Sequence, residues 1–151
     1  MKTLNLVSAD KRNEVPLSQF VERIIEQHSF TVKEQQSIVV NLIHPGLKLN
    51  TGELLTGSII SRLIKVMVAH SRYGQIAISA KELYGKMIEL NIKDENCCNT
   101  YGIALSLQDV VPMAEKAGGR LNILNRKQKI TTVSFSFPVV NDKDSGHSFF
   151  G

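Results

Sequence analysis

The side chains that could act as nucleophiles, bases or metal ligands are few and widely separated along the chain. There are two cysteines, Cys97 and Cys98, and four histidines, His28, His44, His70 and His147. Zinc sites need cysteine and histidine at short paired spacings, and the sequence contains no such spacing. No Ser/His/Asp or Cys/His combination has a spacing that indicates a nucleophilic site. The sequence therefore predicts no catalytic residue and no metal site.

Phosphate transfer through a histidine is the other chemistry open to these residues. In a His-Glu/Asp phosphoacceptor pattern an acidic residue follows the histidine, and none of the four histidines has such a neighbour. His70, at the end of a long expected helix, comes closest to an exposed acceptor. We keep a histidine phosphotransfer adaptor as one alternative function.

Composition excludes several classes of protein. The chain has 151 residues, of which 42% are apolar and 21% charged, which is typical of one globular domain. No apolar run is long enough to span a membrane, and the N-terminal apolar stretch is too short for a signal peptide. Adjacent cysteines rarely form a disulfide, so Cys97 and Cys98 favour a reducing compartment. We expect a cytoplasmic domain without membrane insertion.

The positive charge of the chain does not indicate nucleic-acid binding. The net charge is +4, but the basic residues are scattered apart from one cluster at 126–129. This cluster is typical of a solvated hairpin tip. The chain has no tryptophan and only three tyrosines, and no pattern of aromatic and basic residues supports stacking of nucleic-acid bases. We therefore predict no nucleic-acid partner.

The periodicity of apolar residues predicts the elements that must position any site. Helices are expected at 17–27, 52–71 (with Thr51 as N-cap) and 103–116, and strands at 37–43, 75–80, 87–93, 121–124 and 130–139. The long second helix is apolar over much of its circumference, so we expect Ile59, Leu63 and Met67 to be fully buried. This order of elements predicts an α+β two-layer sandwich, a mostly antiparallel mixed sheet with three helices on one face.

Several motifs in this order resemble a known family. One motif is a Gly-x-Gly-Leu-Gly-Leu box that opens a helix, and its end is similar to Gly102-Ile103-Ala104-Leu105-Ser106-Leu107. The family ends that helix with two glycines, as at Gly118-Gly119, and its closing strand is similar to Phe135-Ser136-Phe137-Pro138. The chain thus resembles the histidine kinase-like ATPase domain (GHKL, or Bergerat, fold) of two-component sensor kinases. The resemblance places this domain at 15–140, with an N-terminal extension at 1–14 and a flexible tail or linker at 141–151.

The resemblance implies nucleotide-binding roles for a few residues. In the family an Asp accepts a hydrogen bond from the adenine amine, and Asp94 matches it. A Thr near the start of the last strand contacts the base, and Thr131 or Thr132 matches it. Gly102 matches the glycine-rich helix start that holds phosphates. Lys65 stands where the family's long helix carries the Asn that ligates Mg²⁺, and an ammonium can contact a phosphate but cannot ligate a metal.

Other parts of the family's ATP site are missing from the sequence. The first glycine box, Asp-x-Gly-x-Gly, here reads Asp94-Glu95-Asn96-Cys97-Cys98. The lost glycines would let the backbone approach the nucleotide. The lid between the two glycine boxes is reduced to residues 95–101, a length typical of a tight turn. No cofactor is therefore expected, and ATP with Mg²⁺ is expected only if the site still functions.

Together these features predict a degenerate histidine-kinase-type ATPase domain in two-component signal transduction that acts through protein–protein contact. The expected partners are a response regulator, a partner kinase or a second copy of the chain. The first alternative is a functional ATP-binding catalytic domain of a sensor histidine kinase or anti-sigma-like kinase, in which case the chain is an enzyme. The second alternative is the histidine phosphotransfer adaptor.

Overall fold

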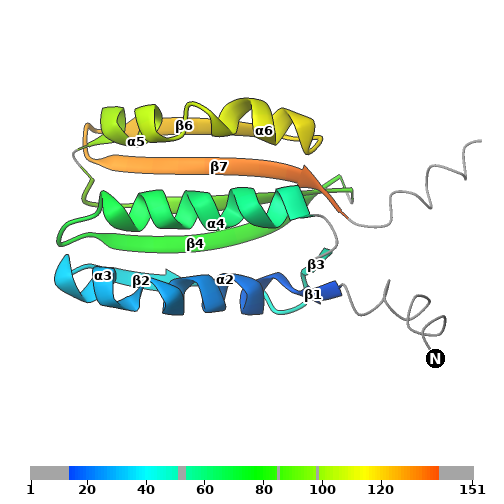
Figure 1. Cartoon of the computed structure of the whole chain (residues 1–151), viewed down its shortest axis with the longest axis horizontal. Helices are drawn as coiled ribbons and strands as arrows, with labels where there is room; N and C mark the ends of the chain where they lie inside the picture. The colour runs from blue at the N-terminus through cyan, green and yellow to red at the C-terminus, as the bar shows by residue number, and fades with distance from the viewer. Residues whose placement is uncertain (1–13, 51–53, 85, 98, 140–151) are drawn as a thin grey trace, which may run out of the picture.

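The computed structural model describes residues 14–50, 54–84, 86–97 and 99–139. These residues form two layers, a mixed β-sheet and a layer of helices that covers one of its faces (Figure 1). The strand order in the sheet is β2-β4-β5-β7-β6, formed by β2 (Ile38–Asn41), β4 (Gln75–Leu83), β5 (Met87–Asp94), β7 (Ile130–Pro138) and β6 (Arg120–Arg126). Strand β2 is parallel to β4, and the other neighbours are antiparallel.

The helical layer consists of α2 (Leu17–Gln27), α3 (Ser29–Glu34), α4 (Leu54–Ala69), α5 (Thr100–Ser106) and α6 (Val110–Lys116). Two short strands, β1 (Glu14–Pro16) and β3 (Lys48–Asn50), pair with each other outside the main sheet. The predicted fold class, an α+β sandwich with a mostly antiparallel sheet and its helices on one face, is confirmed. No helix in the described ranges is both long and apolar enough to cross a membrane.

Helix α4 lies at the centre of the helical layer and supplies much of the core. Ile59, Leu63 and Met67 have no exposed surface, as the sequence predicted. The sheet meets α4 with its inward-facing side chains, which are buried at alternate positions of β5 and β7: Ile88, Leu90, Ile92, Val133, Phe135 and Phe137. Burial of one such side chain stabilises by roughly 1.5–3 kcal/mol. The fold therefore depends on periodic apolar positions.

The prediction of a single helix at 103–116 is wrong in one respect. The structure has two helices there, separated by a turn at 107–109. Pro112 explains the break. In a continuous helix its ring would clash with the carbonyl of Gln108, and it has no N–H to donate. In α6 this proline falls in the first turn, where no intrahelical donor is needed.

An arginine of α4 holds this turn in place. Arg62 donates to the carbonyl of Ser106 at 3.1 Å and to both carboxylate oxygens of Asp109 at 2.9 and 3.2 Å. The hydrogen bond from Arg62 lowers the pKa of the Asp109 carboxyl from its usual value. The pair is exposed on both sides, so its main effect is to orient the turn between α5 and α6.

The remaining differences concern short elements and segment ends. Helix α3 and strands β1 and β3 were not predicted, because elements of three to six residues are too short to show an apolar period. Strand β2 is shorter than the predicted 37–43. The predicted N-cap Thr51, the extension before Glu14 and the tail at 141–151 lie outside the described residues.

Candidate functional site

Two of the residues that the resemblance assigned to a nucleotide, Asp94 and Thr131, lie side by side at one end of the sheet. Asp94 ends β5, Thr131 is the second residue of β7, and the strand register pairs them directly. Both lie on the face of the sheet that meets the helices, and both have no exposed surface. The structure thus brings these two residues together, but neither is open to solvent.

A small polar network covers Thr131. Its Oγ1 lies 2.7 Å from Oγ1 of Thr100, and Nδ2 of Asn125 donates to these hydroxyls at 3.3 and 2.6 Å respectively. Thr100 is the first residue of α5, and Asn125 is paired with Thr131 across β6 and β7. The network therefore fastens the start of α5 onto the end of the sheet. The sequence analysis did not predict this network, because Thr and Asn at the ends of strands and helices carry no distinctive spacing.

Two loops close over Asp94. Gly74, just before β4, lies against the carboxylate, since a Cβ added there would be 2.6 Å from Oδ1 and 3.0 Å from Oδ2. On the other side, Nδ2 of Asn96 donates to the carbonyl of Tyr73 at 3.1 Å and joins the two loops. Tyr73 adopts a φ of 53°, a left-handed conformation that bulky residues rarely take. Asn96 stands where the resemblance places a glycine, and its side chain joins the loops.

Only one of the two carboxylate oxygens of Asp94 has a hydrogen-bond partner among the described residues. Its Oδ1 accepts a hydrogen bond from the backbone N–H of Asn96 at 3.0 Å. Its Oδ2 is buried and has no hydrogen-bond partner among the described residues. An unpaired buried polar group typically costs about 1–3 kcal/mol. The stability of the fold therefore does not account for an aspartate at this position.

Gly102 has a structural use in α5. Oδ1 of Asn99 accepts from the N–H of Gly102 at 3.1 Å and caps the helix. A Cβ on Gly102 would be 2.6 Å from this oxygen, so the glycine makes room for the cap. With seven residues, α5 is one of the shorter helices. Its first turn is occupied by this cap and by the Thr100 network.

His70, the histidine nearest to a phosphoacceptor in the sequence, is engaged at both ring nitrogens. Nδ2 of Asn99 donates to its Nδ1 at 3.1 Å, and its Nε2 lies 3.3 Å from Oγ of Ser106. Because the cap fixes the orientation of the Asn99 amide, Nδ1 is the accepting nitrogen of the imidazole. The ring thereby links the end of α4 to both ends of α5.

Lys65 is exposed on α4 and stands apart from this cluster. Within the described residues, no hydrogen bond or ion pair joins it to Asp94, Thr131 or Gly102. Over the same ranges, no group of three or more His, Cys, Asp or Glu side chains is placed to hold a metal ion.

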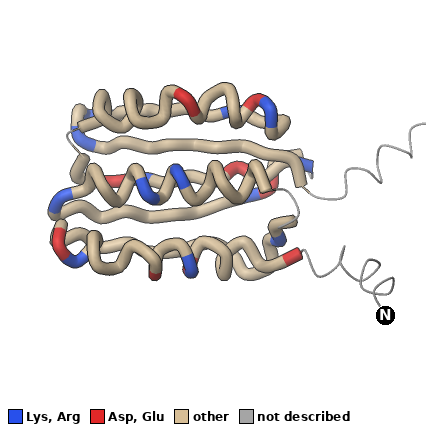
Figure 2. The backbone as a smooth tube through the Cα atoms, viewed as in Figure 1, with Lys and Arg blue, Asp and Glu red and all other residues tan. Residues whose placement is uncertain are grey.

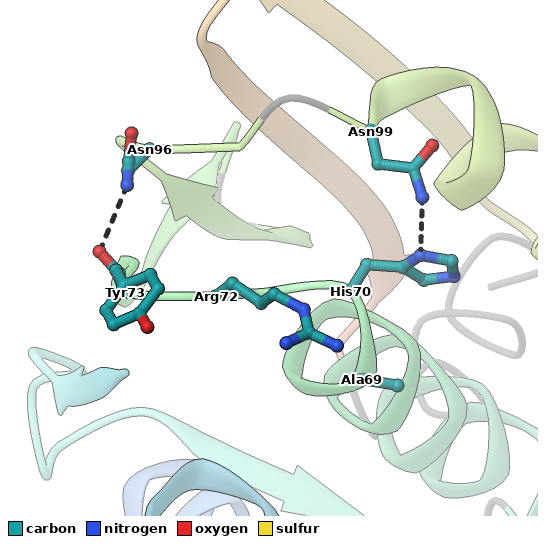
Figure 3. A pocket seen from close by; sticks show the side chains of 6 residues that line it. All are labelled: Ala69, His70, Arg72, Tyr73, Asn96 and Asn99. Carbon is teal, nitrogen blue, oxygen red and sulfur yellow. Dashed lines mark hydrogen bonds between the residues drawn. The ribbon is translucent and has the colours of Figure 1, made fainter. Parts of the chain in front are cut away.

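A pocket of about 510 Å³ lies outside the closed loops and is lined by Ala69, His70, Arg72, Tyr73, Asn96 and Asn99. Figure 3 shows the two bridges at opposite sides of the pocket, Asn96 to Tyr73 and Asn99 to His70, with Arg72 extending between them. Asp94 does not line it. The sequence analysis did not consider Arg72 as a binding residue, because a lone arginine after a helix has no motif.

The arrangement of strands and helices has clear counterparts among solved structures. The catalytic domain of histidine kinase ThkA, in a nucleotide-free form, matches with a TM-score of 0.65 and 13% identity over 83% of this chain and 94% of that chain. Acinetobacter baumannii histidine kinase AdeS matches with a TM-score of 0.68 and 13% identity over 92% and 76% of the two chains. The chain has the fold of a histidine kinase catalytic domain.

A third match to this histidine kinase fold includes a signalling partner. Histidine kinase ThkA in complex with response regulator protein TrrA has a TM-score of 0.62 and 11% identity, over 84% of this chain and 41% of that chain. No protein-family model and no curated protein sequence matches the chain. At these sequence identities the likeness shows the fold alone. The function of this chain must therefore be inferred from the residues of its site.

Replacing Asp94 with asparagine tests whether the second carboxylate oxygen contributes to the stability of the fold. Asparagine keeps an oxygen for the Asn96 N–H and replaces only the unpaired Oδ2, so we expect the free energy of unfolding to change by less than about 1 kcal/mol. Urea denaturation followed by circular dichroism measures it. A loss above about 2 kcal/mol would mean that Oδ2 has a stabilising partner in solution.

Proposed function

We propose that this chain is a degenerate histidine-kinase-type ATPase domain of a two-component signalling pathway, located in the cytoplasm, which acts through protein–protein contact and transfers no phosphate. The observation that carries the proposal is the complete burial of Asp94. In the family this aspartate meets the adenine amine. Here a base cannot reach it unless the Asn96–Tyr73 bridge opens and the Gly74 turn moves.

Two further features support a lost ATP site. Lys65 occupies the position of the metal-ligating Asn, and an ammonium cannot ligate Mg²⁺. Strand β5 ends at Asp94 and α5 begins at Thr100, so only residues 95–99 remain where the family has a long lid. The residues present therefore do not fit Mg-ATP, and no phosphotransfer step is proposed for them.

Calorimetric titration with ATP, with and without Mg²⁺, tests this proposal. If the closed base site, the replaced metal ligand and the lost lid each remove about 1.4 kcal/mol, the affinity falls about tenfold for each. We expect weak or undetectable binding and no Mg²⁺ dependence. Micromolar, Mg²⁺-dependent binding would instead establish the ATP-binding alternative.

Asn96→Gly is the matched variant for this titration. It removes the bridge to Tyr73 and restores one glycine of the family's box, so it should raise ATP affinity by up to about tenfold if closure is one of the defects. Asn122→Gly, an equivalent change at an exposed position of β6, should leave the affinity unchanged. An equal response of the two variants would show that the bridge does not close the site.

The proposed partner is a response regulator, since a structural neighbour, ThkA, is in complex with one. A partner kinase and a second copy of the chain are the other partners that fit a contact function. One observation favours the ATP-binding alternative, the unpaired Oδ2 of Asp94, because an amine of a base would satisfy it. The phosphotransfer adaptor has less support, because both ring nitrogens of His70 are engaged.

A further inference from the structure

We propose that the pocket at the end of α4 receives a carboxylate side chain from an acidic segment of a partner protein, with Arg72 as the residue that pairs with it. The inference gives the chemistry of the partner in the proposed contact function and therefore rests on that function. It concerns the surface outside the bridge between Asn96 and Tyr73, which is distinct from the closed space around Asp94.

Apart from Oδ1 of Asn96 and the hydroxyl of Tyr73, the polar groups that the pocket leaves free are hydrogen-bond donors. Each side-chain amide has two N–H groups, and the bridges of Asn96 and Asn99 use one each, to Tyr73 and to His70. Arg72 adds a guanidinium with five N–H groups and forms no ion pair within the described residues. Oδ1 of Asn99 is already used by the cap of α5. A ligand that supplies acceptors and negative charge complements this set.

The carbonyl groups at the end of α4, which would repel an anion, already accept hydrogen bonds from a glutamine side chain. Nε2 of Gln35 donates to the carbonyls of Val68, Ala69 and Ser71 at 3.4, 2.9 and 2.8 Å. These are the groups at which the negative end of the helix dipole is concentrated. Since Gln35 satisfies them, the pocket beside Ala69 presents Arg72 and the two amides as its main polar groups.

Most of the net positive charge of the molecule lies at the end of the fold that carries the pocket. This end, where α3 and α4 finish and β6 turns into β7, carries Lys33, Arg72, Lys93, Arg126, Lys127 and Lys129 against Glu34, Asp94 and Glu95. The difference of +3 accounts for most of the net charge of +4. Among these nine residues the only ion pair in the described structure is Lys93–Glu95 at 3.5 Å. Figure 2 shows basic positions at this end of the fold, and others in its middle and at the opposite end.

This pattern favours an acidic protein over a nucleic acid. Nucleic-acid surfaces combine a continuous basic groove with a row of stacking aromatic side chains. Here a single arginine lies in one pocket of about 510 Å³, and Tyr73 is its only phenylalanine, tyrosine or tryptophan lining residue among the described positions. An excess of three charges steers an acidic protein surface toward the pocket, and the bidentate fork of Arg72 matches the geometry of a carboxylate.

Fluorescence anisotropy with a labelled peptide of alternating glutamate and glycine, at low salt, tests this inference. We expect the full chain to bind the peptide and Arg72→Ala to weaken binding at least about tenfold. Arg72→Lys should recover only part of the loss, because an ammonium lacks the bidentate fork. The matched control is Arg120→Ala, an exposed arginine at the opposite end of β6, which should change the affinity less than twofold.

Each other outcome overturns the inference. No peptide binding, or equal losses for Arg72→Ala and Arg120→Ala, would mean that the pocket is not a carboxylate site. A larger loss for Lys127→Ala than for Arg72→Ala would assign binding to the hairpin tip. Tighter binding of polyuridine or pyrophosphate than of the peptide would identify a phosphate-bearing ligand. None of these results alters the ATP titration, so failure of this inference and failure of the proposed function can be told apart.

Discussion

Replacing Leu63 with alanine is expected to lower the free energy of unfolding by about 2–5 kcal/mol. Leu63 lies in the middle of α4 with no exposed surface, between the equally buried Ile59 and Met67. Removing its branched end leaves a cavity between the central helix and the sheet, and the surrounding side chains can refill it only in part. Urea denaturation at equilibrium measures the change.

Leu124→Ala is the matched control for this substitution. Leu124 has the same side chain but is 52% exposed on β6, so its loss should cost less than about 0.5 kcal/mol. Similar costs for the two variants, or a cost below about 1 kcal/mol for Leu63→Ala, would contradict the central position of α4 in the core.

The core of the fold could be predicted because its pattern is periodic. Ile59, Leu63 and Met67 recur at four-residue steps on α4, and Val133, Phe135 and Phe137 alternate on β7. The break between α5 and α6 could not be read from periodicity, since the apolar pattern continues through 107–109. It follows from Pro112 and from Arg62, whose contact with Asp109 joins positions 47 residues apart.

The candidate site could be predicted only in part. Asp94 and Thr131 were found because a family motif names them, and the strand register does place them together. Their burial depends on Gly74 before β4, Asn96 after β5 and Thr100 at the start of α5. No local sequence pattern indicates which loop packs over which carboxylate. For the same reason the pocket beside Arg72 is visible only once α4, β4 and β5 are in place.

The second large loss of stability is expected from replacing Gly119, which lies just after the end of α6, with alanine. Gly118 has a φ of 89°, and a Cβ on Gly119 would overlap the backbone carbonyl of Ser136 on β7. The helix therefore ends through a left-handed glycine, and a second glycine lets β6 start against β7. Gly119→Ala must push β6 away from β7, because a backbone carbonyl in a ladder cannot rotate aside. We expect a loss of about 3 kcal/mol or more, at the upper end of overpacking costs.

Gly57→Ala separates this backbone clash from the general effect of a glycine substitution. Gly57 lies inside α4, where alanine favours the helix by roughly 0.5–1 kcal/mol, and its added Cβ would be 3.2 Å from the tip of the Phe20 ring. Because that ring can shift, the free energy of unfolding should change by less than about 1 kcal/mol. Thermal and urea denaturation of both variants give the comparison. If Gly119→Ala proved as mild as Gly57→Ala, β6 would not start against β7 at Gly119.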